Sequence, residues 1–249
     1  KSTLEGVNVR YYHCKVPSVT LAWNTAAKLA KGSLLLFLDD DIDLSFNVLD
    51  AHRKYYTDRP NIIGVAGGYY ASSYDRIWIP SSRKGSATTL AGVNASFRKD
   101  VFIKAGVPSS YIKSFAPFDW EIAEHLMVNY GQLAVGEDIL VYHRAPASGG
   151  CENQAKRGVN WYYGCYHNHF LWMLWRRFPH NISKLPRHIY TLLKYCIPSK
   201  DILFSADYWK ISVIKGIRDA YHQYKNDSKT RTTESYNAAD VKCIMDYSR

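Results

Sequence analysis

The sequence lacks any long hydrophobic stretch. Unbroken apolar runs such as Leu34–Leu38 are much shorter than the roughly 20 residues that cross a bilayer. No signal-peptide pattern opens the chain. A membrane-spanning or secreted protein is therefore not expected, and we predict a cytoplasmic protein that is soluble or peripherally bound to a membrane.

Cysteine is sparse and irregularly placed. The five cysteines are odd in number, widely spaced and free of any CxxC pair; they are Cys14, Cys151, Cys165, Cys196 and Cys243. This pattern indicates neither a disulfide framework nor a zinc knuckle, and a reducing cytoplasm is the expected compartment.

Acidic residues are outnumbered by basic ones. The 249 residues contain 32 Lys plus Arg against 22 Asp plus Glu, which gives a formal charge of +10. A basic chain favours anionic partners such as nucleotide phosphates, anionic lipid or nucleic acid, and charge alone does not choose among them. The length suits one large α/β domain with a helical appendage.

Residues 1–150 alternate short β-rich apolar runs with helical stretches, which predicts a sheet flanked by helices. Predicted strands cover 7–12, 33–38, 62–66, 88–97 and 133–143, and Gly67 and Gly68 are expected to close the third. Predicted helices cover 19–30, 46–56, 99–105 and 119–130, and 81–86 is expected to be a loop.

Composition changes after Ser148-Gly149-Gly150. From 151 to about 225 the chain is dense in Trp, Tyr, Leu and Arg at helical spacing, which predicts a helical region. Residues 226–249 are polar enough to form a tail. No internal repeat is present.

Three consecutive aspartates, Asp39, Asp40 and Asp41, follow the predicted buried strand 33–38. Like charges so close together raise one another's pKa and resist desolvation, and a divalent cation is the simplest compensation. Strand carboxyl ends border the ligand crevice in open α/β sheets, and hard oxygen ligands suit Mn²⁺ or Mg²⁺ bridging a diphosphate. A solvated, helix-capping acidic turn is the alternative.

The stretch 26–41 resembles the "N-x-A-x-x-x-A-x-G-x-x-x-x-F-L-D-D-D" signature of family 2 glycosyltransferases, and Asn24 stands where their asparagine does. The resemblance implies a GT-A fold, which is a Rossmann-like mixed sheet flanked by helices. It also implies that Asp39, Asp40 and Asp41 form the DxD motif. With Asn24 they would bind a nucleotide-sugar donor and its metal-bound diphosphate.

Two downstream segments extend the resemblance. Gly92–Gly106 is similar to the family's "G-x-N-x-x-F-R-R-x-x-F…G" segment, and 118–122 is similar to "E-D-x-E-L" with Phe118 in place of the first acid. The resemblance implies that Asp119 is the general base of an inverting transfer. It further implies a sugar and acceptor site lined by Gly92, Asn94, Trp120 and Glu121.

His143 matches a family position at which a histidine often joins the metal site, so the implied metal ligands are Asp39, Asp41 and His143. A base within reach of an acceptor hydroxyl and a cation at the departing diphosphate are what direct displacement needs. Asp119 also has a structural interpretation, because an acid is favoured at a helix start. Both interpretations can hold together.

The region after Gly150 carries weaker matches. Gln154–Gly158 contains half of the Q-x-x-R-W motif of processive synthases, with Gly158 in place of Trp, which disfavours processive synthesis. Residues 162–172 and 211–220 resemble C-terminal helices of rhamnosyl- and galactofuranosyl-transferase-like members. The Trp, Leu and Arg of 161–178 suit a membrane interface, or packing against the catalytic domain.

The family's opening nucleotide-binding strands have no counterpart in this sequence, whose residues 1–12 resemble the third strand. The predicted function is metal-dependent, inverting, non-processive transfer from a nucleotide sugar to a glycan, lipid-linked or protein acceptor. A metal-dependent phosphohydrolase or nuclease and a non-catalytic basic binding module or inactive relative are the alternatives. No nucleic-acid motif supports the last class, so nucleic acid is not an expected partner.

Overall fold

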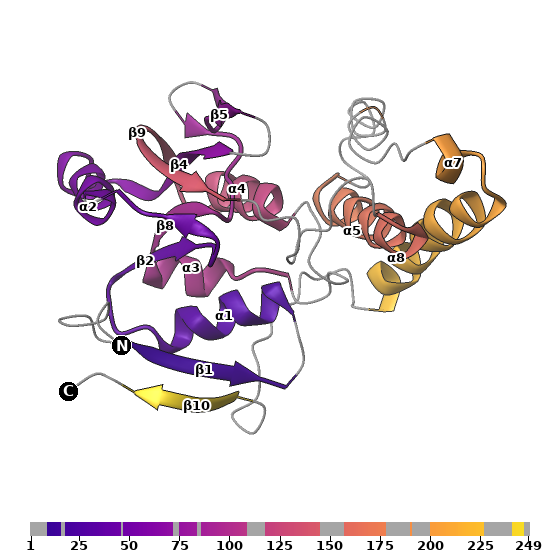
Figure 1. Ribbon diagram of the computed structural model, residues 1–249, viewed down its shortest axis with the longest axis horizontal. Coiled ribbons are helices and arrows are strands. Elements are labelled where there is room, and N and C mark those ends of the chain that lie inside the picture. Colours follow the sequence, from indigo (N-terminus) through magenta and orange to yellow (C-terminus); the bar gives the residue numbers. More distant parts are fainter. Residues whose placement is uncertain are drawn as a thin grey trace.

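The computed structural model describes residues 9–15, 18–45, 47–71, 75–83, 86–108, 118–144, 157–177, 190, 200–226 and 241–246. These residues form an α/β body and a group of C-terminal helices beside it (Figure 1). The predicted class, a mixed sheet flanked by helices with a helical extension, is confirmed.

One mixed sheet organises the α/β body. Its strand order is β2 (Leu34–Leu38), β8 (Asn94–Arg98), β4 (Ile62–Ala71), β9 (Gln132–His143) and β3 (Ile42–Asp43), with β5 (Arg76–Trp78) paired to β4. β4 and β9 are parallel, and β8 runs antiparallel to both β2 and β4. The carboxyl ends of β2, β4 and β9 therefore lie at the same edge, where ligands bind in open sheets of this kind.

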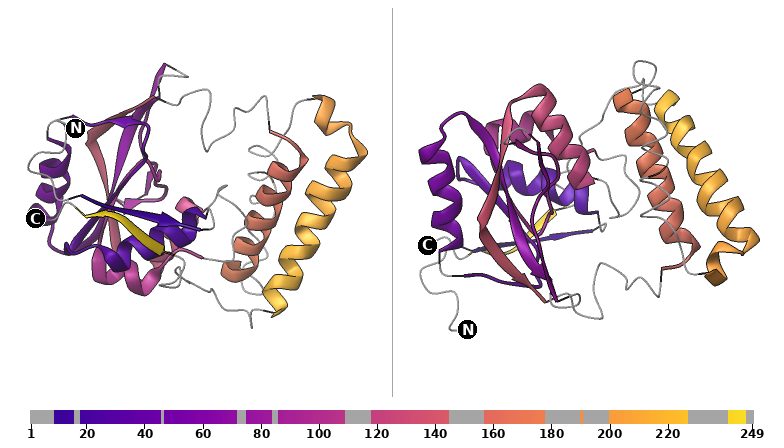
Figure 2. Two further views of the ribbon diagram at one scale, coloured as in Figure 1. Left: turned by 60° about the horizontal axis from the view of Figure 1, so that its bottom comes forward. Right: turned by 90° about the horizontal axis from the view of Figure 1, so that it is seen from above.

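Helices cover both faces of the sheet. One hydrophobic cluster packs α1 (Val19–Leu29), α3 (Lys99–Ala105) and α4 (Phe118–Asn129) on one face, and a second packs α2 (Val48–Asp58) on the other. Figure 2 shows these layers from two further directions. Neighbouring residues of β4 divide between the faces, with Ile63 and Ala66 in the first cluster and Ile62 and Val65 in the second. Burial on both faces explains its continuous apolar run.

Two glycines that were expected to end a strand lie inside it. β4 continues through Gly67 and Gly68 to Ala71, so that prediction was wrong. A Cβ atom on Gly67 would come within 2.3 Å of Asn94 Nδ2, and one on Gly68 within 2.7 Å of the Trp78 carbonyl oxygen. The glycines therefore mark close approach of neighbouring groups, and the register of β4 against β9 shifts between them.

The first strand stands apart from the main sheet. β1 (Arg10–Cys14) pairs antiparallel with β10 (Val241–Asp246) in a two-stranded sheet, and Arg10 donates a hydrogen bond to the Leu29 carbonyl at the end of α1. This pairing corrects two expectations. The segment expected to be a strand of the family's sheet lies outside that sheet, and the segment expected to be a tail contains a strand. β10 lies more than 200 residues after β1 in the chain, so no local sequence pattern predicts that the two strands pair.

The C-terminal helices pack against one another. α5 (Val159–Arg177) contacts the π-helical segment η3 (Tyr208–Lys215) and α8 (Gly216–Asn226), and the short α7 (Lys200–Leu203) precedes them. A Cβ atom on Gly216 would lie 3.0 Å from the Tyr163 carbonyl oxygen, so glycine permits this close crossing.

A further correction concerns residues 81–86, predicted as a loop: β6 (Ser82–Arg83) and β7 (Ser86–Ala87) pair there.

Candidate functional site

The acidic turn joins two strands of the main sheet. Asp39, Asp40 and Asp41 connect β2 to β3, and β3 pairs antiparallel with the end of β9 so that Ile42 lies opposite His143. The backbone N–H of Arg144 donates to the Asp41 carbonyl oxygen at 2.9 Å. This pairing fixes the turn against β9 and brings together side chains about a hundred positions apart in the sequence.

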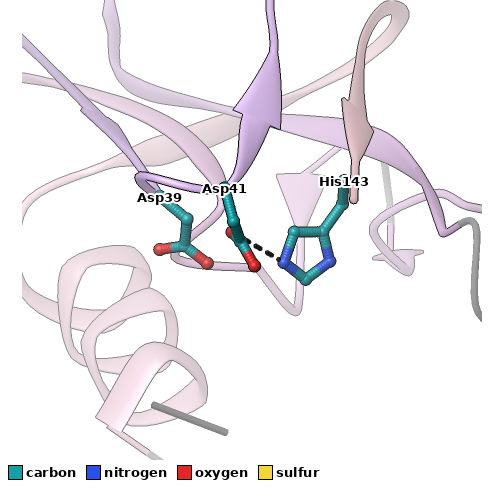
Figure 3. A group of neighbouring side chains, drawn as sticks. All are labelled: Asp39, Asp41 and His143. Atoms are coloured by element: carbon teal, nitrogen blue, oxygen red, sulfur yellow. Dashed lines mark ion pairs between the residues drawn. The ribbon is translucent and has the colours of Figure 1, made fainter. Parts of the chain in front are cut away.

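His143 faces the turn across that pairing. Its Nε2 lies 3.1 Å from Asp41 Oδ1, an ion pair when the imidazole is protonated. One ligand atom from each of Asp39, Asp41 and His143 lies within 4.8 Å of the other two (Figure 3). The three side chains predicted to hold a metal are therefore neighbours. Whether they bind one stays a prediction.

The electrostatics of the turn suit a cation. Burial raises the pKa of Asp39, the charges of Asp41 and Asp40 raise it further, and His143 acts in the opposite direction. Two carboxylates and an imidazole in one small volume form an oxygen-rich donor set of the kind that Mn²⁺ and Mg²⁺ accept. A bound cation would offset both the burial and the like-charge repulsion that disfavour the ionised form of Asp39.

Asp119 lies at the start of α4 and interacts electrostatically with the acidic turn. Its carboxylate accepts a hydrogen bond of 2.9 Å from the backbone N–H of Trp120. Burial raises the pKa of Asp119 to about 7 against the opposing effect of backbone hydrogen bonds, and the charge of Asp39 raises it further. Asp119 thus lies in the first turn of α4 and close enough to the acidic turn to respond to Asp39, and its role as a general base stays a prediction.

The side-chain amides of two predicted site residues, Asn24 and Asn94, form hydrogen bonds within the protein. Asn24 donates to the Val107 carbonyl oxygen at 2.8 Å and accepts from the Val107 N–H at 2.7 Å. Asn94 is fully buried, and it donates to the carbonyl oxygens of Gly68 and Ile139. These contacts give the polar atoms of both side chains partners inside the protein, and the expected contact of Asn24 with a donor and of Asn94 with a sugar stays a prediction.

Asn94 belongs to a buried network under the sheet. Its Oδ1 lies 2.8 Å from His52 Nε2, and the other ring nitrogen of His52 lies 2.8 Å from Ser96 Oγ, which also contacts Tyr56 OH at 2.9 Å. Burial lowers the pKa of His52, which keeps the ring neutral. Through these bonds His52 and Tyr56 connect α2 to β8 of the main sheet.

The remaining predicted residues differ in exposure. Asp40 is exposed, and Gly92 and Trp120 are half-buried. Glu121 is fully buried, and its expected place in the sugar and acceptor site stays a prediction. The Trp120 ring stands edge-on to the ring of His169 on α5, with centroids 6.5 Å apart. This contact links the start of α4 to the C-terminal helices.

Sequence reasoning missed the aromatic residues beside His143. The Tyr69 ring stands edge-on to the imidazole with centroids 5.6 Å apart, and it stacks on Trp78 at 5.3 Å. Their position depends on β4 lying beside both β5 and β9, which no local pattern predicts. The signal available in the sequence was the group of aromatic residues Tyr69, Tyr70 and Trp78 that follows the predicted strand 62–66.

The structure also bears on the C-terminal predictions. Trp161, Tyr162, Leu171, Trp172 and Leu174 of α5 are buried. These buried side chains favour packing, the alternative to the membrane contact expected through 161–178, of which 178 lies outside the described residues. Arg157 lies over the Trp161 ring at 4.0 Å, and the rest of the Q-x-x-R match, 154–156, lies outside the described residues. No helix of the described part reaches the length and hydropathy needed to span a bilayer.

No family model and no curated protein matches this chain. Thirty-three chains of solved structures match in fold. One is the mannosyltransferase PcManGT from Pyrobaculum calidifontis in complex with GDP-Man and Mn²⁺. It shows 15% identity and a TM-score of 0.40, with coverage of 85% of this chain and 55% of that one. Another is GalNAc-T7 with UDP, GalNAc and Mn²⁺, with 14% identity, a TM-score of 0.42, and coverage of 84% and 45%. This chain spans about half the length of these proteins, and values so low carry no argument about function.

Proposed function

We propose that this chain is the catalytic part of a family 2-like glycosyltransferase of the GT-A fold. It would transfer a sugar from a nucleotide-diphosphate sugar to an acceptor hydroxyl with inversion and without processive synthesis. The observation that carries the proposal is the meeting of Asp39, Asp41 and His143 at one sheet edge, with Asp119 in electrostatic reach of Asp39. The order of sequence matches supports the same assignment.

Asp39, Asp41 and His143 would hold the cation, Mn²⁺ or Mg²⁺. The chemistry that the cation supplies when bound is neutralisation of negative charge on the departing diphosphate. Arg144 keeps the turn in place through its backbone bond to Asp41. The Tyr69 ring, which stacks on Trp78, packs against the His143 imidazole and restricts its movement. Asp40 is exposed beside them and adds negative charge that favours cation binding.

Asp119 would act as the base. The acceptor oxygen forms its bond to the anomeric carbon while the bond from that carbon to the diphosphate oxygen breaks. The hydroxyl proton passes to the Asp119 carboxylate, and the leaving nucleoside diphosphate keeps the bonding electron pair. A pKa of about 7 suits a base that works near neutral pH. Attack opposite to the leaving group inverts the anomeric configuration.

A two-metal phosphohydrolase receives less support. Such an enzyme needs ligands for two cations about 4 Å apart. Among the described residues, Asp39, Asp41 and His143 form the single group of metal-ligand side chains close enough to bind one ion. One group of three ligands fits one cation that is also bound by a substrate diphosphate.

The test is a screen of nucleotide sugars for Mn²⁺-dependent release of free nucleoside diphosphate. The screen includes glycan, lipid-linked and peptide acceptors, and active pairs are followed by NMR of the anomeric proton. We expect an inverted product, loss of transfer in Asp119→Asn, and retained Mn²⁺ binding in that variant. Transfer by Asp119→Asn at the wild-type rate, or a retained anomer, would contradict the role of Asp119. Transfer that needs no divalent cation would contradict the role of the acidic turn.

A further inference from the structure

The segment from α7 to α8 exposes large apolar side chains. Phe204 is 81% exposed, Ile214 63% and Trp209 49%, and Tyr221 is also exposed. The Trp209 indole N–H donates to the Leu203 carbonyl oxygen at 2.9 Å, and its ring stands edge-on to that of Tyr208 with centroids 5.4 Å apart, which holds Trp209 on this face. Apolar side chains gathered on one exposed face mark an interaction surface more often than isolated ones do.

The buried side of the same segment explains why these residues point outward. Every fourth residue here is buried and contacts α5, namely Tyr208, Ser212, Gly216 and Ala220. The residues two positions further along lie on the opposite side, and all of them are exposed: Lys210, Ile214, Arg218 and His222. Figures 1 and 2 show α8 on the far side of α5 from the sheet. The exposed side of η3 and α8 therefore faces away from the α/β body.

This outward face is basic as well as apolar. Between positions 208 and 226 the chain has four basic residues and one acidic residue, an excess of three positive charges. The acid, Asp219, is engaged by Tyr163 and Lys215 at 2.9 and 2.8 Å and by Arg218 at 3.1 Å. Lys210 and Lys225 are exposed, and the Lys225 ammonium lies over the Tyr221 ring at 4.8 Å.

We propose that the outward face of η3 and α8, defined by Trp209, Lys210, Ile214, Arg218, Tyr221 and Lys225, binds the surface of a membrane containing anionic phospholipid. Trp209, Ile214 and Tyr221 enter the boundary between head groups and acyl chains, where aromatic rings with a polar tip are favoured. The basic side chains pair with lipid phosphates and carboxylates. Charge complementarity selects this occupant, because a second copy of the chain would bring the same positive charge to the contact.

Vesicle co-sedimentation tests the proposal with two lipid compositions. One vesicle is phosphatidylcholine alone, and the other contains about 30 mol% phosphatidylserine, which supplies the anionic charge that attracts basic side chains. We expect the protein to sediment with the second vesicle and much less with the first. Binding should weaken as salt is raised. Absence of binding to both vesicles, or equal binding to both at low salt, would overturn the proposal.

Matched variants locate the surface. Ile214→Glu should weaken binding about tenfold or more, because it removes an exposed apolar side chain that would enter the membrane boundary and adds a charge that anionic lipid repels. Lys210→Gln should weaken it about fivefold. Leu49→Glu on α2 is the control, since Leu49 is 60% exposed and lies outside this face. Equal weakening by Ile214→Glu and Leu49→Glu would overturn the assignment.

Two measurements separate other outcomes. Light scattering with size-exclusion chromatography reports the oligomeric state. Conversion of a dimer to a monomer by Ile214→Glu, with vesicle binding unchanged, would assign the face to a second copy and overturn the proposal. An Asp39→Ala/Asp41→Ala variant should bind vesicles like the wild type. Failure of the proposed glycosyl transfer would therefore leave the membrane proposal standing, and the reverse also holds.

Discussion

Two histidines mark two polar clusters in the same sheet, and the clusters differ in how fully their atoms are satisfied. His52 is buried, and both of its ring nitrogens have neutral partners, Asn94 and Ser96. His143 lies at the sheet edge beside Asp41 and Asp39, where carboxylates repel one another. A polar group with all of its hydrogen bonds made stabilises the fold, whereas a group of uncompensated acids favours a ligand. The difference separates a structural cluster from a candidate binding cluster without reference to any relative.

The largest expected effect is at the acidic turn. The double variant Asp39→Asn/Asp41→Asn should lower Mn²⁺-dependent sugar transfer about a thousandfold, as loss of electrostatic stabilisation at a transition state does. Its thermal unfolding temperature without cation should be equal to or higher than that of the wild type, because like-charge repulsion is removed. Activity assays and thermal melts check both parts. A large loss of stability would show that the acids are structural.

Asn94→Ala should have the opposite profile. It removes two donated hydrogen bonds and leaves a ring nitrogen of His52 without its partner, so the free energy of unfolding should fall by about 3 kcal/mol. Mn²⁺ binding by the folded protein should persist. Urea unfolding measures the loss. The exposed Asn47→Ala serves as control and should change stability by less than about 0.5 kcal/mol.

Gly67→Ala tests the packing between the two clusters. The new methyl group would meet Asn94 Nδ2 at 2.3 Å, so Asn94 must move and stability should fall by about 2 kcal/mol. Gly158→Ala is the matched control, because a Cβ atom there meets nothing within 4 Å. Equal unfolding midpoints for the two variants would show that Asn94 adapts without cost.

The pH dependence of stability sharpens the comparison further. Burial lowers the pKa of His52 below the ordinary value of 6.5, so the unfolded state binds this proton more readily than the folded state. Stability should therefore fall as the pH drops below about 6.5, by at most about 1.4 kcal/mol per pH unit from this one group. His52→Gln should reduce that slope. Urea midpoints between pH 5 and 7.5, at about half-unit steps, measure it.

The smallest expected effect is at Arg144. Its guanidinium pairs with Asp43 on the surface, whereas its backbone N–H holds the Asp41 carbonyl oxygen. Arg144→Gln removes the exposed pair and keeps the backbone bond, so the unfolding temperature and Mn²⁺ affinity should both stay within error. A clear loss of Mn²⁺ affinity would show that the Arg144 side chain, and not its backbone, positions the turn.

Sequence patterns predicted the local elements of the body well. The helix predicted at 19–30 is α1, the strand predicted at 33–38 is β2, and the helix predicted at 99–105 is α3. Each of these rests on the spacing of apolar residues and on nearby capping or glycine signals, which act within a few positions. The strand predicted at 88–97 begins later, at Asn94, because its preceding residues do not pair in the sheet.

The polar residues Asn24, Asn94 and Glu121 show what a sequence motif does not predict. A motif match predicts that a residue is important, but it does not separate contact with a ligand from support beneath it. Asn94 lies under the sheet edge because β4 carries glycines that admit its side chain, a fact that requires the pairing of two strands. Glu121 is buried by the packing of α4, although its local sequence allows an exposed position.

The sequence by itself determined the acidic turn after a buried strand, the helix that begins near Asp119, and the basic, aromatic character of the C-terminal region. Only the tertiary structure decided that His143 lies beside Asp41 and that the Asn94 side chain is fully buried. It also decided that β1 pairs with β10 and which side of η3 and α8 is exposed. The physical reason is that propensity and periodicity act between neighbours in the chain. Strand register, burial of a polar atom and the exposed side of a helix depend on contacts between residues that only folding brings together.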